Sequence, residues 1–255
     1  MKNKGKIAFI VEGPVKEQQI FQNIKKNFFA NTQIEIISIP AKQNLYMLWN
    51  TLKTDDFQTD ILEIIKEYYK RETHEEMNFL SADFQEIYLF FDYDGHQNNL
   101  PAEVDPDLAL NQMLETFDNE TELGKLYVSY PMVEAIKDLQ SEEKCRAFER
   151  CEVPITKIGE YKRTLGKNIS YNQIKKYDKE WNAIIKVFVS RIRCMLNLDE
   201  QITFEVYRER IDPQKIYEIQ RKKYVVKKKC IFVLSAFPEF LLDYFPKDFW
   251  TTYIS

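Results

Sequence analysis

The sequence predicts an α/β protein, with a parallel sheet flanked by helices and an added all-helical section. Three observations support this. Short apolar runs alternate with segments of helical spacing through the first part of the chain, as expected where helices connect parallel strands. Two of the runs end in acidic residues followed by glycine. Beyond about residue 141, apolar residues recur every three or four positions, which is typical of helices. We therefore expect two domains, residues 1–140 and 141–255.

The first strand, helix and second strand form a predicted βαβ unit. The run Lys6–Val11 is short and almost continuously apolar, which indicates a strand buried on both faces. Residues Gln33–Pro40, rich in β-branched side chains, predict a second strand beside it. Between them a helix begins near Val15. Its spacing predicts an apolar face with Ile20, Phe21, Ile24 and Phe28, and a polar face with Lys16, Glu17, Gln22 and Lys25.

The next elements continue the alternation. Residues 43–80 contain one or two amphipathic helices, and Glu86–Asp92 is another apolar run that ends in acids and a glycine. A helix to about Phe117 precedes a fourth strand, Lys125–Pro131, which leads into a helix that carries Glu134.

The rest of the chain is predicted to be helical. Apolar residues from Ile174 to Met195 follow three-and-four spacing over more than five turns, so we expect a helix with a buried apolar stripe. The segment Cys230–Phe245 is too apolar for a free tail and is expected to pack onto one of the two cores.

Composition and charge narrow the classes of function. The 255 residues are 44% hydrophobic and 30% charged, as in ordinary globular proteins, and no apolar run is long enough for a signal peptide or a membrane span. We expect a cytoplasmic protein. The four cysteines lack CxxC spacing, which argues against structural zinc. The net charge of -4 hides an uneven distribution: residues 1–140 carry -11, residues 141–229 carry +9, and the remainder carry -2. The basic part, including the run 220–229, is a candidate for binding a polyanion.

Three acids are predicted to meet at one edge of the sheet. Ligands of open α/β sheets bind at the carboxyl ends of the strands, where Glu12 follows the first strand and Asp92 and Asp94 end the third. Asp92 and Asp94 point to the same side because strand side chains alternate. Carboxylates held together favour a hard divalent cation, so we expect Mg²⁺ or Mn²⁺. Gly13 and Gly95, which follow these acids, would allow a close approach of the backbone.

These motifs resemble a known family. Ile-Val-Glu12-Gly13-Pro14 followed by a helix, and Phe-Phe-Asp92-Tyr-Asp94-Gly95, are similar to the two signature motifs of the TOPRIM domain, over roughly residues 5–140. The segment around Glu134 resembles a segment of OLD-like nucleases and of the TOPRIM effector of the PARIS anti-phage system. The resemblance implies a Mg²⁺-dependent nuclease that acts on RNA such as tRNA, or on DNA. It further implies a toxic defence effector with an ATPase sensor partner and a homodimeric active form. Many OLD-type members carry an acid four residues after the motif Glu, where this chain has Lys16, and Glu17 follows one position later.

The expected mechanism is metal-assisted hydrolysis of a phosphodiester. Asp92 and Asp94 hold the ion, and Glu12 either adds a ligand or accepts the proton of the attacking water. Glu134 is expected in the outer ligand sphere. Lys162 or Arg163 is a candidate cation for the transition state, with exposed loop charges as the alternative.

Two other functions remain open. Asp92 and Asp94 also resemble the nucleophile motif of haloacid-dehalogenase-type phosphatases, although His96-Gln97-Asn98 replaces the usual continuation. The other alternative is a non-catalytic interaction subunit held by a larger ATPase partner. Hydrolysis of a small aryl phosphate would indicate the phosphatase, and cleavage of nucleic acid the nuclease.

Overall fold

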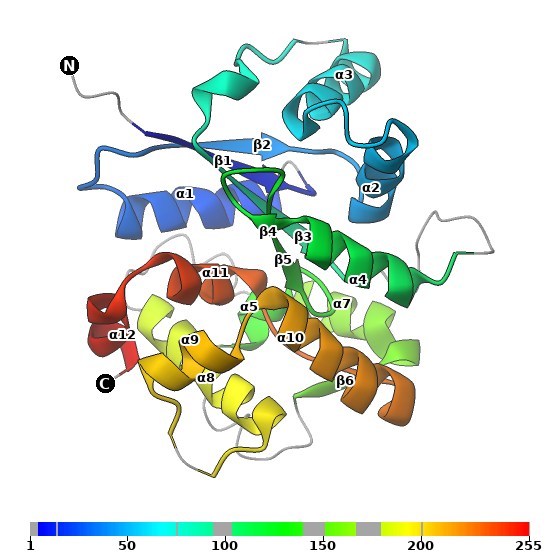
Figure 1. Ribbon diagram of the computed structural model, residues 1–255. Helices are drawn as coiled ribbons and strands as arrows, with labels where there is room; N and C mark the ends of the chain where they lie inside the picture. The colour runs from blue at the N-terminus through cyan, green and yellow to red at the C-terminus, as the bar shows by residue number, and fades with distance from the viewer. Residues whose placement is uncertain are drawn as a thin grey trace. The chain divides into compact units, whose positions relative to one another are not determined.

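The computed structural model has an α/β fold with a five-stranded, mostly parallel sheet, followed by a largely helical section (Figure 1). It describes residues 5–13, 15–74, 76–93, 104–139, 151–166, 180–199 and 201–254. The chain divides into two compact units, Met1–Leu126 and Tyr127–Ser255. The boundary expected at residue 140 stays a prediction.

The sheet is built around the predicted βαβ unit. Its strands are β1 (Lys6–Val11), β2 (Glu35–Pro40), β3 (Glu86–Asp92), β4 (Asp118–Asn119) and β5 (Gly124–Ser129). Their order is β2-β1-β3-β5-β4. β1 pairs in parallel with β2 and with β3, which confirms that the second strand returns beside the first. The short strand β4, antiparallel to β5, was not predicted.

Among the described residues of the first unit, four helices and a 3₁₀ turn accompany the sheet. They are α1 (Lys16–Phe28), α2 (Leu45–Thr54), α3 (Ile61–Thr73), the turn η1 (Ser81–Asp83) and α4 (Pro106–Thr116). Polar residues fix three of the helix starts: Asn44, Asp60 and Asp105 each accept a backbone N–H from the first turn that follows. In Figure 1, α1 lies on one side of the sheet and α2 and α3 on the other, as right-handed crossovers in opposite directions require.

One layer of the core of the first unit lies between α1 and the sheet. Residues Ile7–Val11 are all buried, which confirms a strand covered on both faces. The Phe21 ring lies 4.6 Å from Phe9 and 4.7 Å from Phe90, between ring centroids. These aromatic pairs fix α1 over β1 and β3.

Helix α1 also covers the outer edge of β2, which no described strand pairs on that side. The Lys25 ammonium donates to the Ile36 carbonyl at 3.2 Å, and the Gln18 amide donates to the Ser38 carbonyl at 3.3 Å. Both bonds satisfy backbone acceptors that a further strand would otherwise use.

The described part of the second unit is helical apart from the end of β5 and one small ladder. Its helices are α5 (Ala135–Asp138), α7 (Ile158–Gly166), α8 (Glu180–Leu196), α9 (Phe204–Arg210), α10 (Pro213–Ile219), α11 (Ala236–Tyr244) and α12 (Lys247–Ile254), with the 3₁₀ turn η2 (Ile155–Lys157) and the π-helical segment η4 (Gln220–Val226). Strands β6 (Glu152–Pro154) and β7 (Cys230–Phe232) pair antiparallel. The prediction of an all-helical section was wrong at this ladder.

The predicted apolar segments of the second unit are buried. The stripe of α8 is buried at Trp181, Ile184, Ile185, Phe188, Ile192 and Met195, while Ile174 and Tyr177 lie outside the described residues. Every residue from Cys230 to Leu242 is buried, and α11 packs against α8. The expected packing of the C-terminal segment onto a core is confirmed. In the described parts of the chain, no helix combines the length and the apolarity needed to cross a membrane.

Candidate functional site

The candidate site is the carboxyl edge of β1 and β3, where two of the predicted acidic endings meet. In the parallel register Val11 lies opposite Phe90, so Glu12 and Asp92 stand at the same edge of the sheet. Oε2 of Glu12 accepts a hydrogen bond from the backbone N–H of Asp92, with N and O 3.3 Å apart. Both residues are half-buried. The fold thus brings Glu12 into contact with the backbone of Asp92, while the role of either residue in binding metal stays a prediction.

A third acid, Glu17 of α1, also reaches the turn that follows Glu12. A Cβ atom on Gly13 would lie only 2.8 Å from Oε2 and 3.1 Å from Oε1 of Glu17. The Glu17 carboxylate therefore lies directly against the backbone of Gly13, and only a glycine leaves it that space. Glu17 retains 8% exposure.

The prediction that Glu17 belongs to the polar face of its helix was wrong. Glu17 stands three and four positions before Ile20 and Phe21, and it shares their buried face. That spacing was the signal in the sequence that could have found it. Lys16, which stands four positions after Glu12, is exposed instead.

The metal site that the sequence predicts is only partly within the described residues. Asp94 lies outside them, together with Gly95 and His96. Among the residues that the structure describes, no group of three or more His, Cys, Asp or Glu side chains is close enough to hold a metal ion. The side chains found at this edge, Glu12, Glu17 and Asp92, offer carboxylate oxygens, which are the ligands that Mg²⁺ and Mn²⁺ prefer.

Glu134, expected in the outer ligand sphere, is a buried residue of the second unit. It directly precedes α5 and retains 1% exposure. Nearby, burial and the charge of Asp138 are the main causes that raise the pKa of Tyr161 well above its usual value, and the charge of Glu134 adds to this. Glu134 therefore belongs to a buried charged cluster in the second unit, and its part in metal binding stays a prediction.

Arg191 of α8 holds this cluster together. Its side chain is fully buried and donates to the backbone carbonyls of Val233 and Asp138, each at 2.9 Å. Its Nη2 lies 3.7 Å from a carboxylate oxygen of Asp138. The Lys137 ammonium donates to the Leu165 carbonyl at 3.0 Å. Buried charges are tolerated where such partners replace water.

The predicted cations Lys162 and Arg163 lie on helix α7. The alternative interpretation placed them in a loop, and this was wrong. Both side chains are exposed. The hydroxyl of the neighbouring residue Tyr161 donates a hydrogen bond to the Asp138 carboxylate at 3.5 Å. A role for Lys162 at a scissile phosphate stays a prediction.

The basic run 220–229 exposes five cations in the second unit: Arg221, Lys222, Lys227, Lys228 and Lys229. Lys222 and Lys228 also form ion pairs, with Glu218 at 3.9 Å and with Glu152 at 2.6 Å. Arg221 and Lys222 lie on η4, and the three other cations follow it directly.

Comparison with known proteins assigns no relative to this chain: no protein-family model matches it, and neither a curated protein nor a solved structure is significantly similar.

Proposed function

We propose that this chain is a metal-dependent nuclease whose active site is the carboxyl edge of β1 and β3. The observation that carries the proposal is the hydrogen bond from the backbone of Asp92 to the carboxylate of Glu12. It joins the acidic residues at the ends of two strands, 80 positions apart in the sequence, at the edge where open α/β sheets bind their ligands.

In this proposal, Asp92 and Asp94 hold Mg²⁺ or Mn²⁺, and Glu12 adds a ligand or accepts the proton of the attacking water. A bound divalent ion supplies positive charge to the phosphate and lowers the pKa of water. Glu17, which lies against Gly13, adds a further carboxylate beside Glu12 and increases the negative potential that attracts a cation.

The second unit supports a polyanionic substrate. Its five exposed cations on the run 220–229 are of the kind that bind nucleic acid through its phosphates. Phosphate contacts do not distinguish RNA from DNA, so both belong in the assay. The resemblance to TOPRIM effectors extends the proposal to a toxic role in phage defence. In that role an ATPase sensor is the partner protein, and the active form is a homodimer.

The test compares the wild type with Glu12→Gln and Asp92→Asn. We expect the wild type to cleave tRNA, single-stranded RNA or plasmid DNA with Mg²⁺ but not with a chelator. Each variant should lose at least about a hundredfold in rate, the scale of losing an acid–base or ligand group. Glu115→Gln, at an exposed carboxylate of α4, is the matched control and should cleave normally.

Full Mg²⁺-dependent cleavage by both variants would contradict the proposal. Hydrolysis of an aryl phosphate without any cleavage of nucleic acid would favour the phosphatase instead. Circular dichroism of each variant shows whether a lost activity reflects the site or the fold.

A further inference from the structure

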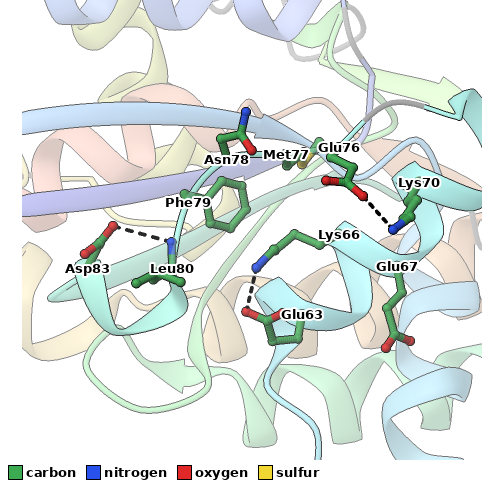
Figure 2. A pocket seen from close by; sticks show the side chains of 10 residues that line it. All are labelled: Glu63, Lys66, Glu67, Lys70, Glu76, Met77, Asn78, Phe79, Leu80 and Asp83. Atoms are coloured by element: carbon green, nitrogen blue, oxygen red, sulfur yellow. Dashed lines mark hydrogen bonds and ion pairs between the residues drawn. The ribbon is translucent and has the colours of Figure 1, made fainter.

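A second candidate site is a surface groove of the first unit, between α3 and residues 76–83 (Figure 2). Its volume is about 530 Å³. Asp83 at one end pairs with Lys6 at 3.5 Å, and Lys6 begins the strand that ends just before Glu12. Since a six-residue strand spans roughly 20 Å, the groove lies at the opposite end of the sheet from the carboxylates.

Polar contacts between its two walls hold the groove in shape. The Lys70 ammonium of α3 pairs with Glu76 at 2.6 Å, and the Ser81 hydroxyl donates to Glu63 of α3 at 2.9 Å. The groove therefore exists before any partner arrives, and a ligand does not bear the cost of ordering it.

An apolar strip lies along the wall formed by residues 76–83. Leu80 is 66% exposed, the highest value among the large hydrophobic side chains of the described residues. The Phe79 ring, which points into the groove in Figure 2, packs edge-on to Phe84 at 5.4 Å and lies 5.4 Å from the Lys66 ammonium. Phe79 is thus held in place, beside a leucine that is open to solvent.

The backbone of the same wall is available for pairing. The amide and carbonyl groups of Met77, Asn78 and Phe79 form no hydrogen bond with the part of the chain that the structure describes. Leu80, the next residue, has extended backbone angles, φ -104° and ψ 139°. Backbone groups that are open beside an extended residue can pair with an added strand.

The charge of the groove indicates what such a strand would carry. Four acids line the groove against two lysines. Both lysines pair with acids of the groove, Lys66 with Glu63 and Lys70 with Glu76. Asp83 pairs with Lys6, which does not line the groove. Glu67 is exposed and has no ion pair among the described residues. The groove therefore repels phosphate and favours a cationic partner.

We propose that this groove binds an extended basic segment of a partner protein by strand addition. The segment pairs its backbone with Met77–Phe79, seats a large apolar side chain on Phe79 and Leu80, and places a Lys or Arg beside Glu67. This inference is independent of the proposed nuclease, because the groove shares no residue with the carboxylate edge.

The test measures binding of fluorescent peptides to the full chain by fluorescence anisotropy. The probe is a peptide of alternating leucine and threonine with two lysines at each end. One matched peptide carries glutamate in place of lysine, and another carries N-methyl groups on alternate amides, which block strand pairing. We expect saturable binding of the lysine peptide, and at least about tenfold weaker binding of the other two.

Two variants locate the binding. Leu80→Ser should weaken the lysine peptide about tenfold, and Glu67→Lys about fivefold while improving the glutamate peptide. Matched controls are Leu108→Ser on α4, where the leucine is 55% exposed, and Glu72→Lys on α3, whose side chain is 49% exposed. Neither control residue lines the groove, so both should bind like the wild type.

Several outcomes would overturn the inference. One is the absence of saturable binding by the lysine peptide. Another is equal binding of the glutamate or N-methylated peptide. Equal binding by Leu80→Ser and its control would place the peptide elsewhere. Self-association that Leu80→Ser abolishes would assign the groove to a second copy of this chain.

Discussion

At the scale of single residues, Gly13 leaves room for the Glu17 carboxylate at the turn that follows Glu12. Glu12 is fixed by the backbone N–H of Asp92, and Glu17 lies against the backbone of the next residue. Because any Cβ at position 13 would meet the Glu17 carboxylate, this glycine couples the end of β1 to the first turn of α1.

Replacing Gly13 with alanine tests that coupling. A Cβ would meet Oε2 of Glu17 at 2.8 Å, so the carboxylate must move. We expect Gly13→Ala to slow Mg²⁺-dependent cleavage by about tenfold or more, because small misplacements at an active site are costly. The measurement is the cleavage rate across a Mg²⁺ titration.

Gly159→Ala is the control, since a Cβ there meets nothing within 4 Å. Gly159 lies on α7, where alanine should be neutral or stabilise by up to about 1 kcal/mol. Unchanged cleavage by Gly13→Ala would show that the position of Glu17 is irrelevant to the chemistry.

That Glu12 and Asp92 stand at one edge of the sheet could be predicted, because each follows or ends an apolar run and parallel strands bring their carboxyl ends to the same edge. The position of Glu17 was predicted wrongly, because a charged side chain normally lies on the polar face of a helix. The helix buries Glu17 with Ile20 and Phe21. A buried acid of this kind is identified from its three- and four-residue spacing to the apolar residues of the helix, and not from its polarity.

At the scale of elements, the π-helical segment η4 is organised by Gln220. This side chain is 1% exposed. Its amide donates to the carbonyl of Phe232 at 2.5 Å and accepts the N–H of Phe232 at 3.1 Å. It thus pairs with β7 as a neighbouring strand would. The wide turns of a π-helix are frequent at functional sites, and here they carry two of the exposed cations, Arg221 and Lys222.

Replacing Gln220 with methionine should destabilise the second unit. The side chain keeps a similar size, but the N–H and C=O of buried Phe232 lose their partners. The expected loss is about 2–4 kcal/mol in the free energy of unfolding. Urea unfolding followed by tryptophan fluorescence measures it.

Gln22→Met, at an exposed position of α1, should change that free energy by less than about 0.5 kcal/mol. A Gln220→Met protein as stable as this control would show that water or a rearranged backbone replaces the lost amide.

The ladder formed by β6 and β7 shows why some elements escape prediction. Each strand has three residues, and the two lie far apart in the sequence. Three residues are too few to display the alternation that reveals a strand. Their pairing depends on tertiary contacts such as those of Gln220, which no local pattern contains.

At the scale of the whole molecule, the second unit holds several proton-bearing groups away from water. Burial is the largest cause that raises the pKa of Cys230 to about 12, and a hydrogen bond to Glu152 adds to it. Burial also raises the pKa of Tyr161, Tyr207 and Tyr224. All four groups keep their protons in the folded state at pH values where the unfolded chain loses them.

This difference predicts a loss of stability in alkali. The pKa of these groups in the unfolded chain is 9.0 for cysteine and 10.0 for tyrosine. Below these pH values the groups are protonated in both states, and their contribution to stability is complete. As the pH rises toward the higher pKa of the folded state, only the unfolded chain loses the protons, and the free energy of unfolding falls. We expect the free energy of unfolding to fall between about pH 8 and pH 10.5. Urea titrations at both pH values check it.

Tyr224→Phe keeps the ring but removes one of these protons, so its stability should fall less steeply over the same interval. A wild-type stability that is flat or rises with pH would contradict the assignment of buried neutral groups.

Much of the α/β fold was predictable because buried parallel strands appear as apolar runs in the sequence. The strand order was not. Whether β3 lies beside β1 or beside β2 depends on packing such as that of Phe21 on Phe9 and Phe90, and periodicity within a segment carries no information about its neighbours.

The side chains of Gln18 and Lys25 on the outer carbonyls of β2 have a consequence for the protein in crowded solution. An unprotected edge strand can pair with the same strand of another molecule, and repeated pairing leads to fibrils. Such pairing at β2 would first break the two hydrogen bonds of Gln18 and Lys25, so these side chains oppose polymerisation at this edge of the sheet.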